Sequence, residues 1–129
     1  MSSWGKRACR RLDYARAMAE PHPGVFVAHA STTEWEPDPE VPGSLMHELM
    51  NTDGIQAGFT RFTSVDGPVP WTPEQREIAL ILEGSVRIEI EGGDTLELAV
   101  GDLFSLPPGV ATTWHMTTPF KEMWVLVHR

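Results

Sequence analysis

The sequence has 129 residues, one cysteine and a formal net charge of −8 at pH 7. This length predicts one domain with room for a hydrophobic core, and a single cysteine excludes an intrachain disulfide, as is usual in the reducing cytoplasm. No apolar run approaches the ~20 residues of a membrane helix, and no signal peptide is evident. We therefore expect a cytoplasmic protein without a membrane partner.

Residues 1–20 predict a basic extension, helical or disordered, ahead of a single domain at residues 21–129. The stretch R-R-L-D-Y-A-R-A-M-A-E contains good helix formers and ends before Pro21. Residues 1–16 carry five basic residues and one acidic residue, while the remainder carries five basic and 17 acidic residues. A mobile extension is the simplest interpretation, with a transit peptide or a nucleic-acid arm as alternatives. The acidic remainder repels phosphate, so nucleic acid is not the expected partner.

Residues 25–63 predict strands on either side of an acidic, proline-rich loop. Residues 25–29 (V-F-V-A-H) predict a first strand, at a sheet edge or exchanged with a partner chain. Residues 31–43 predict a surface loop that Trp35 pins to the domain, and residues 45–50 fit either a helical turn or a strand. Residues 55–63 alternate as a strand, and Gly58 within it predicts a bulge or a close backbone approach.

Residues 77–109 predict four short strands joined by tight turns. Residues 78–82 are an apolar run, residues 86–90 and 96–100 alternate apolar with polar, and residues 103–106 end at two prolines. Gly92-Gly93-Asp94 suits a hairpin turn. A proline-broken loop at 69–76 precedes this region, and two strands at 111–116 and 123–128 follow it. The pattern is typical of an antiparallel all-β sandwich or barrel.

Two spacings in this region resemble the motifs of the cupin superfamily. Six residues separate Glu77 from Gly84, as at the end of the first cupin motif, and Gly101, Pro107 and Gly109 fit the second. Trp114 lies five residues after Gly109. This position resembles that of a tryptophan in small single-domain cupins related to ureidoglycine aminohydrolase and the ethanolamine-utilisation cupin. The resemblance covers roughly residues 45–127 and implies a cupin double-stranded β-helix, or jelly-roll barrel.

The apolar run at residues 78–82 also predicts an oligomer. Ile78, Leu80 and Leu82 alternate with Ala79 and Ile81, so both faces of this strand are apolar. A strand buried on both faces of a small barrel needs a cover on the outside. A second subunit is the simplest cover, and the resemblance also implies homodimers.

The resemblance implies a metal site of three histidines and one glutamate, yet only the glutamate stands here, as Glu77. Residues 70–73, where two histidines are expected, read P-W-T-P, and Thr112 replaces the third. We therefore expect a degenerate site and no tightly held cofactor. If a divalent transition metal binds instead, Glu77, Glu74 and His115 are the ligands to test. Strand alternation, however, places His115 on the face opposite Thr112 and Trp114.

We expect the pocket to bind a small molecule through side chains near the barrel mouth: Trp71, Glu77, Thr112, Trp114 and Arg61. Indole rings stack on planar or apolar ligands, although plain core packing also explains them. A pocket filled by the protein's own side chains is a third possibility.

An enzyme is the alternative function, and it would depend on Glu77. A carboxyl in an apolar pocket has a raised pKa and suits a general acid or base. The resemblance then implies hydrolysis, isomerisation or a lyase reaction on a small metabolite. A structural role, in which Glu77 bonds backbone, Arg61 or Arg76, is the other interpretation of the same residue.

Overall fold

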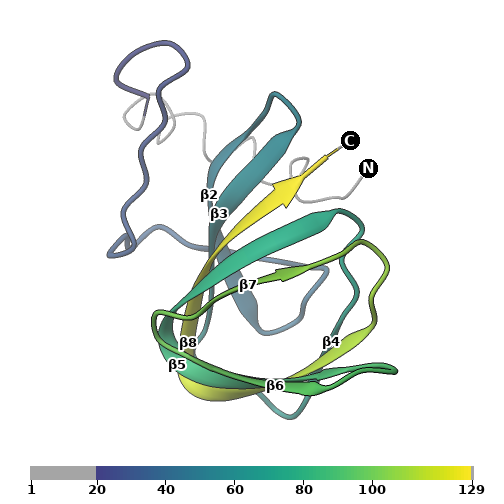
Figure 1. Cartoon of the computed structure of the whole chain (residues 1–129). Helices are drawn as coiled ribbons and strands as arrows, with labels where there is room; N and C mark the ends of the chain where they lie inside the picture. The colour runs from purple at the N-terminus through teal and green to yellow at the C-terminus, as the bar shows by residue number, and fades with distance from the viewer. Residues whose placement is uncertain (1–19, 129) are drawn as a thin grey trace.

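The computed structural model describes residues 20–128, so the predicted extension lies outside it except for its last residue. The described residues contain strands and no helix, and none of them forms a helix that could cross a membrane. The strands are β1 (Glu36–Pro37), β2 (Ser44–Thr52), β3 (Ile55–Phe62), β4 (Val69–Trp71), β5 (Arg76–Ile90), β6 (Thr95–Ala99), β7 (Leu103–Leu106) and β8 (Thr112–Val127). They curve around a common interior (Figure 1), which confirms the predicted all-β jelly-roll barrel.

All strand pairs are antiparallel, and β8 organises them. The sheet order is β1-β2-β3-β8-β5-β6, with β4 also paired to β8 and β7 to β5. The β5–β8 ladder runs from Arg76 opposite Val127 to Ile90 opposite Thr112. Two long strands therefore hold the short ones in register, and the predicted hairpin after residue 90 joins β5 to β6.

The prediction of separate strands at 78–82 and 86–90, and at 111–116 and 123–128, is wrong, because each pair is one bent strand. Gly84 is the reason. Its φ is +78°, and a Cβ there would lie 2.5 Å from the carbonyl oxygens of both Pro119 and Thr117. The register shifts on either side of Glu83. Gly84 thus forms a bulge that turns β5 and β8 around the barrel without ending them.

The predictions for the segments before residue 77 are confirmed in some places and wrong in others. Residues 45–50 lie in β2, and three residues of the predicted 69–76 loop form β4. Residues 25–29 form no strand in this chain, since only an isolated bridge joins Val25 to His22. Gly58 is a close-approach position, as predicted, because a Cβ there would lie 2.5 Å from the carbonyl oxygen of His47.

Trp35 pins the acidic loop to the barrel, as predicted. Its ring lies 5.4 Å from the guanidinium carbon of Arg61 on β3 and 5.9 Å from the ammonium of Lys121 on β8. These contacts are on the outer face of the sheet. The loop beyond Trp35 then returns to the barrel mouth, where Asp38 is buried.

Two groups of buried apolar side chains fill the interior. The larger, which we call the apolar half, contains Phe62, Ile81, Val86, Ile88, Leu106, Trp114 and Phe120. The smaller contains Met46, Ala79, Trp124 and Leu126, and it shares Trp71 and Phe104 with the first as partly buried neighbours. We call this smaller group and the buried polar side chains around it the polar half.

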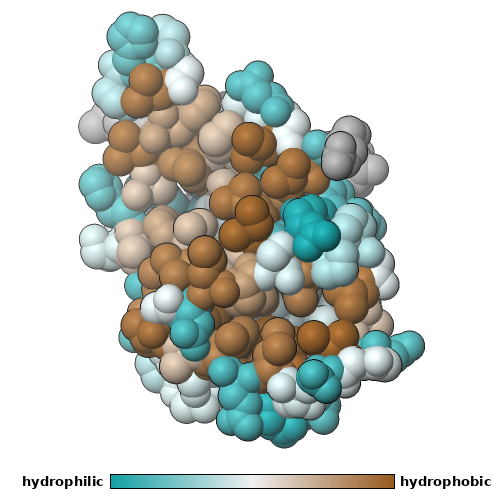
Figure 2. Space-filling view, viewed as in Figure 1, coloured by the Kyte–Doolittle hydropathy of each residue, from teal (hydrophilic) through white to brown (hydrophobic). Residues whose placement is uncertain are grey.

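The outer face also carries exposed apolar side chains. Ile78 and Leu103 are 36% and 66% exposed, and Figure 2 shows hydrophobic surface extending across the face formed by β5, β7 and β8. The prediction that both faces of β5 are apolar therefore holds in the folded chain.

Candidate ligand-binding site

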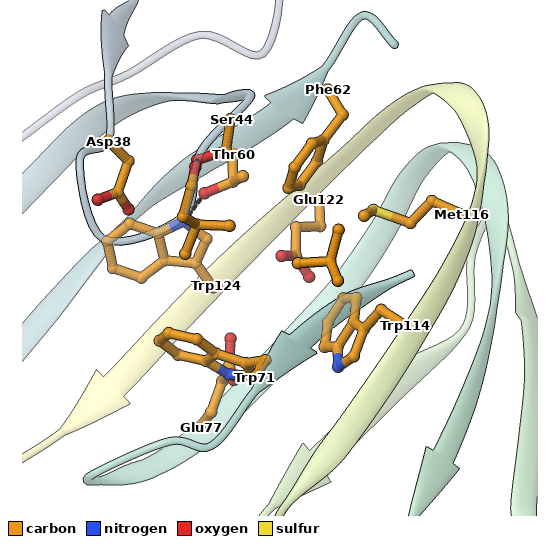
Figure 3. Close-up of a pocket in the computed structure, with 12 residues that line it drawn as sticks. Asp38, Ser44, Thr60, Phe62, Trp71, Glu77, Trp114, Met116, Glu122 and Trp124 are labelled. Carbon is orange, nitrogen blue, oxygen red and sulfur yellow. Dashed lines mark hydrogen bonds between the residues drawn. The ribbon is translucent and has the colours of Figure 1, made fainter. Parts of the chain in front are cut away.

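A pocket opens into the barrel where the apolar and polar halves meet. It contains about 420 Å³ of space that no protein atom fills, and this figure includes open solvent at the mouth. Its walls come from the loop after β1 and from β2, β3, β4, β5 and β8, and are formed by Asp38, Val41, Ser44, Thr60, Phe62, Val69, Trp71, Glu77, Trp114, Met116, Glu122 and Trp124. Figure 3 draws these side chains as sticks and labels most of them.

Glu77 lies on the wall of this pocket, as predicted from its position in the motif. It is inward-facing on β5 and only 4% exposed. Its Oε1 accepts a hydrogen bond of 2.7 Å from Trp71 Nε1. Burial raises the pKa of Glu77 to about 7, and the hydrogen bond from Trp71 partly opposes that rise. At neutral pH this carboxyl therefore exists in both protonation states.

Glu122 is a second buried carboxyl in the same pocket, and the sequence analysis missed it. It lies on β8 and is 6% exposed, and its Oε1 has no hydrogen-bond partner among residues 20–128. Burial, and then the charge of Glu77, raise its pKa well above the ordinary value. In Figure 3 the carboxyl of Glu122 points into the centre of the pocket, and that of Glu77 lies beside the ring of Trp71. Two carboxyls that share a dry site resist simultaneous ionisation.

Strand register explains how the pair forms. Glu77 faces Leu126 across the β5–β8 ladder, and Glu122 faces Ile81. The Ala79–Trp124 pair lies between them on the same inward face. Because alanine is small, the space beside it is open to the two carboxyls.

Hydrogen bonds fix the indole groups that line the pocket. Trp114 Nε1 donates to Thr112 Oγ1 at 2.9 Å, and Thr112 Oγ1 donates to the carbonyl oxygen of Trp71. Trp124 Nε1 donates to Thr60 Oγ1 at 2.8 Å. Each indole N–H therefore has a protein acceptor, and Trp71, the least buried of the three, presents its ring to the pocket beside Glu77.

A model of the EutQ-like cupin domain matches residues 61–123, which contain both motif ends and most of the pocket. This chain is a small cupin. The predicted resemblance to the ethanolamine-utilisation branch is confirmed by that match.

Solved structures share the cupin fold with this chain. A crystal structure of an ethanolamine utilization protein Q candidate from Salmonella typhimurium aligns with TM-score 0.68 and 23% identity, over 82% of this chain and 88% of that one. An RmlC-like cupin from Shewanella frigidimarina aligns with TM-score 0.63 and 18% identity, over 79% and 89%. KdgF from Halomonas sp. aligns with TM-score 0.59 and 22% identity, over 74% and 89%. Among curated proteins, none has a significantly similar sequence.

Two of the predicted ligand-binding residues do not line the pocket of this cupin. Trp71, Glu77 and Trp114 come together there, whereas Thr112 lies behind the indoles and positions them. Arg61 is on the outward-facing side of β3, with its guanidinium over Trp35. The alternation of β3 explains this position, since Thr60 and Phe62 are the residues that face inward.

The residues present do not fit the metal site of the usual cupin kind. Glu74 is exposed, and His115 lies outside the barrel, where its Nε2 is 2.8 Å from Glu89 Oε1. The conditional set of Glu77, Glu74 and His115 is therefore not assembled. Within residues 20–128, no three His, Cys, Asp or Glu side chains are close enough to hold a metal ion.

A sequence signal for Glu122 existed. The alternate residues Phe120, Glu122, Trp124 and Leu126 lie on the same face of one strand. All of them except Glu122 are bulky and apolar. A glutamate on that face is out of place in a plain core, and buried ionisable groups concentrate at functional sites.

Proposed function

We propose that this cupin binds a small organic molecule in the barrel pocket, through Glu77 and Glu122, without a tightly held metal of the usual cupin kind. The observation that carries the proposal is the convergence of two buried carboxyls on one pocket. Taking a carboxyl out of water is unfavourable unless it is paired or hydrogen-bonded. Packing alone would be served better by apolar residues of similar volume.

The competing structural interpretation is that the carboxyls only complete a polar core. A thermal-shift screen of small metabolites separates the two. We expect at least one compound to raise the Tm of the wild type and of the Glu89→Gln control, because a ligand that binds only the folded state stabilises it. The same compound should leave the Tm of Glu77→Gln and Glu122→Gln unchanged. Compounds that stabilise all four proteins equally would place the binding site elsewhere.

A second candidate is an enzyme that works by acid–base catalysis, and the unequal environments of the two carboxyls favour it. Glu77 has a pKa of about 7, which suits a general base at neutral pH. Glu122, whose pKa is raised further by the charge of Glu77, would hold its proton and act as the acid. Isomerisation, hydrolysis and lyase steps all need such proton transfers.

The enzyme proposal is tested on a compound that the screen identifies. Glu77→Gln should reduce its turnover by about 100-fold or more, with a Tm no lower than that of the wild type. Unchanged turnover would remove Glu77 from the catalytic role and leave binding as the function.

We also propose a cytoplasmic homodimer, formed through the exposed hydrophobic surface of β5, β7 and β8. The exposure of Ile78 and Leu103 supports it. Ile78→Glu should convert the dimer to a monomer in light scattering, because it buries a charge in the contact. A wild type that is monomeric at every concentration would contradict the dimer.

A further inference from the structure

We infer that the pocket selects a small organic cation with several N–H donors, such as a primary ammonium or an amidinium group. This inference rests on the proposed binding function, and it adds the chemical class of the ligand. Three features of the pocket lead to it: its charge, its hydrogen-bonding capacity and its aromatic wall.

The charge of the lining is entirely acidic. Asp38 enters from the loop after β1, Glu77 from β5 and Glu122 from β8, and no Lys, Arg or His lies among the lining residues that the structure describes. Charges in such a partly desolvated site interact much more strongly than in water. A carboxylate or phosphate ligand would meet like charge without a compensating cation. A cation would instead stabilise the ionised forms of Glu77 and Glu122 together.

The hydrogen-bonding capacity of the pocket is biased toward acceptors. The indole N–H groups of Trp71, Trp114 and Trp124 already donate to Glu77, Thr112 and Thr60. The hydroxyl of Ser44 donates to the carbonyl oxygen of Val41. Apart from the protonated forms of Glu77 and Glu122, a ligand that offers acceptors alone therefore finds few donors on this wall.

Glu122 supplies the observation that points to a missing donor. It is more than nine-tenths buried, it lines the pocket, and its Oε1 has no hydrogen-bond partner within residues 20–128. A buried acceptor left without a donor is unfavourable by about 1–3 kcal/mol. An N–H group of a bound cation would satisfy Glu122 and neutralise the pair in the same contact.

The aromatic wall completes the preference. The rings of Trp71 and Trp114 flank the carboxyls (Figure 3), and the face of an indole attracts a cation through its quadrupole. A planar amidinium can stack on the ring and still direct its N–H groups at the carboxylates. Carboxylates and indole rings in one small pocket thus recognise the same kind of ligand.

The test uses three probes of one shape: acetamidinium, acetamide and acetate, which are cationic, neutral and anionic. The ¹H–¹⁵N indole signals report on the pocket, since three of the five tryptophans line it, and Trp71→Phe assigns the Trp71 signal. At pH 8 we expect acetamidinium to shift the lining indole signals saturably. Acetamide and acetate should leave them unmoved at the same concentrations.

Variants connect the effect to the carboxyls. Glu122→Gln and Glu77→Gln should each weaken acetamidinium binding by about tenfold, the usual worth of one charged hydrogen bond. Glu89→Gln, whose carboxylate lies outside the barrel beside His115, should bind as the wild type does. The indole spectrum of each variant shows directly that the protein is folded.

The other outcomes overturn the inference. If acetamide or acetate binds as tightly as acetamidinium, the pocket binds small molecules but does not select cations. If none of the probes moves a lining indole, small cations are not its ligands. In both cases the metabolite screen still decides the proposed function, so the two proposals fail separately.

Discussion

The two halves of the barrel interior are built from the same strands but differ in chemistry. The apolar half packs seven buried hydrophobic side chains contributed by β3, β5, β7 and β8. The polar half has four, and its buried polar side chains include Glu48, Gln56, Thr60, Glu77 and Glu122. The larger apolar cluster lies in the first half, and buried ionisable groups that packing alone does not require lie in the second. Such a local departure from good packing is expected at a functional site.

Removing a large side chain from the apolar half should have the largest effect on stability. Ile88 is fully buried, and Ile88→Ala should lower the free energy of unfolding by about 3 kcal/mol, through lost burial and a residual cavity. Urea unfolding measures this change. Val100→Ala, at an exposed position, should change it by less than about 0.5 kcal/mol. Equal effects at both sites would contradict the assignment of the apolar half.

In the polar half, the stability contributed by Glu77 should depend on pH. Its pKa is about 7 in the folded protein and 4.5 ordinarily. The folded state therefore retains a proton that the unfolded state loses, and stability falls as pH rises from about 4.5 to 7. That difference corresponds to roughly 3 kcal/mol.

Glu77→Gln tests this dependence, because glutamine is neutral and its oxygen can still accept the Trp71 hydrogen bond. The variant should match the wild type near pH 4.5 and exceed its stability above pH 7, in urea unfolding measured across that range. A wild type and a variant with parallel pH profiles would show that Glu77 is not buried as described.

Glu122→Met should separate stability from binding. The methionine fills a similar volume without a charge, so the free energy of unfolding at pH 8 should rise by about 1–2 kcal/mol. Binding of acetamidinium should be lost in the same variant. A destabilised Glu122→Met would indicate that the carboxyl makes a structural contact that its burial does not reveal.

Apart from the Val100→Ala control, Thr112→Val should have the smallest effect on stability. It preserves shape but removes the hydroxyl that links Trp114 to the backbone of Trp71. Unfolding should become easier by about 1 kcal/mol, and the indole signal of Trp71 should shift as its ring loses this support. A Trp71 signal unchanged from the wild type would show that Thr112 does not position the ring.

Much of the fold was predictable because it depends on local rules. The alternation of residues 86–90 and the turn at Gly92-Gly93-Asp94 follow from strand and hairpin chemistry, and both are observed. The bends in β5 and β8 were not predictable, because Gly84 ends a strand or forms a bulge according to what lies opposite. Here the carbonyl oxygens of Thr117 and Pro119 lie opposite, and they come from a segment distant in sequence.

The site was predictable in part for the same reason. Glu77 and Trp114 were identified through motif spacing, and Trp71 as an indole beside the barrel strands; all three line the pocket. Asp38 was missed because its loop returns to the barrel mouth only in three dimensions. Arg61 was predicted to bind the ligand, although the alternation of side chains along β3 places it on the outer face. There its guanidinium lies over the ring of Trp35.

The titration of the two pocket carboxyls, followed by ¹³C NMR in the wild type and in Glu77→Gln, tests the central claim most directly. The pair predicts that Glu77 titrates near pH 7 and that the pKa of Glu122 is well above its ordinary value. It also predicts that the pKa of Glu122 falls in Glu77→Gln but stays raised, because burial is its larger cause. Two carboxyls that titrate near pH 4.5, each unaffected by the other, would contradict a buried pair and the pocket built around it.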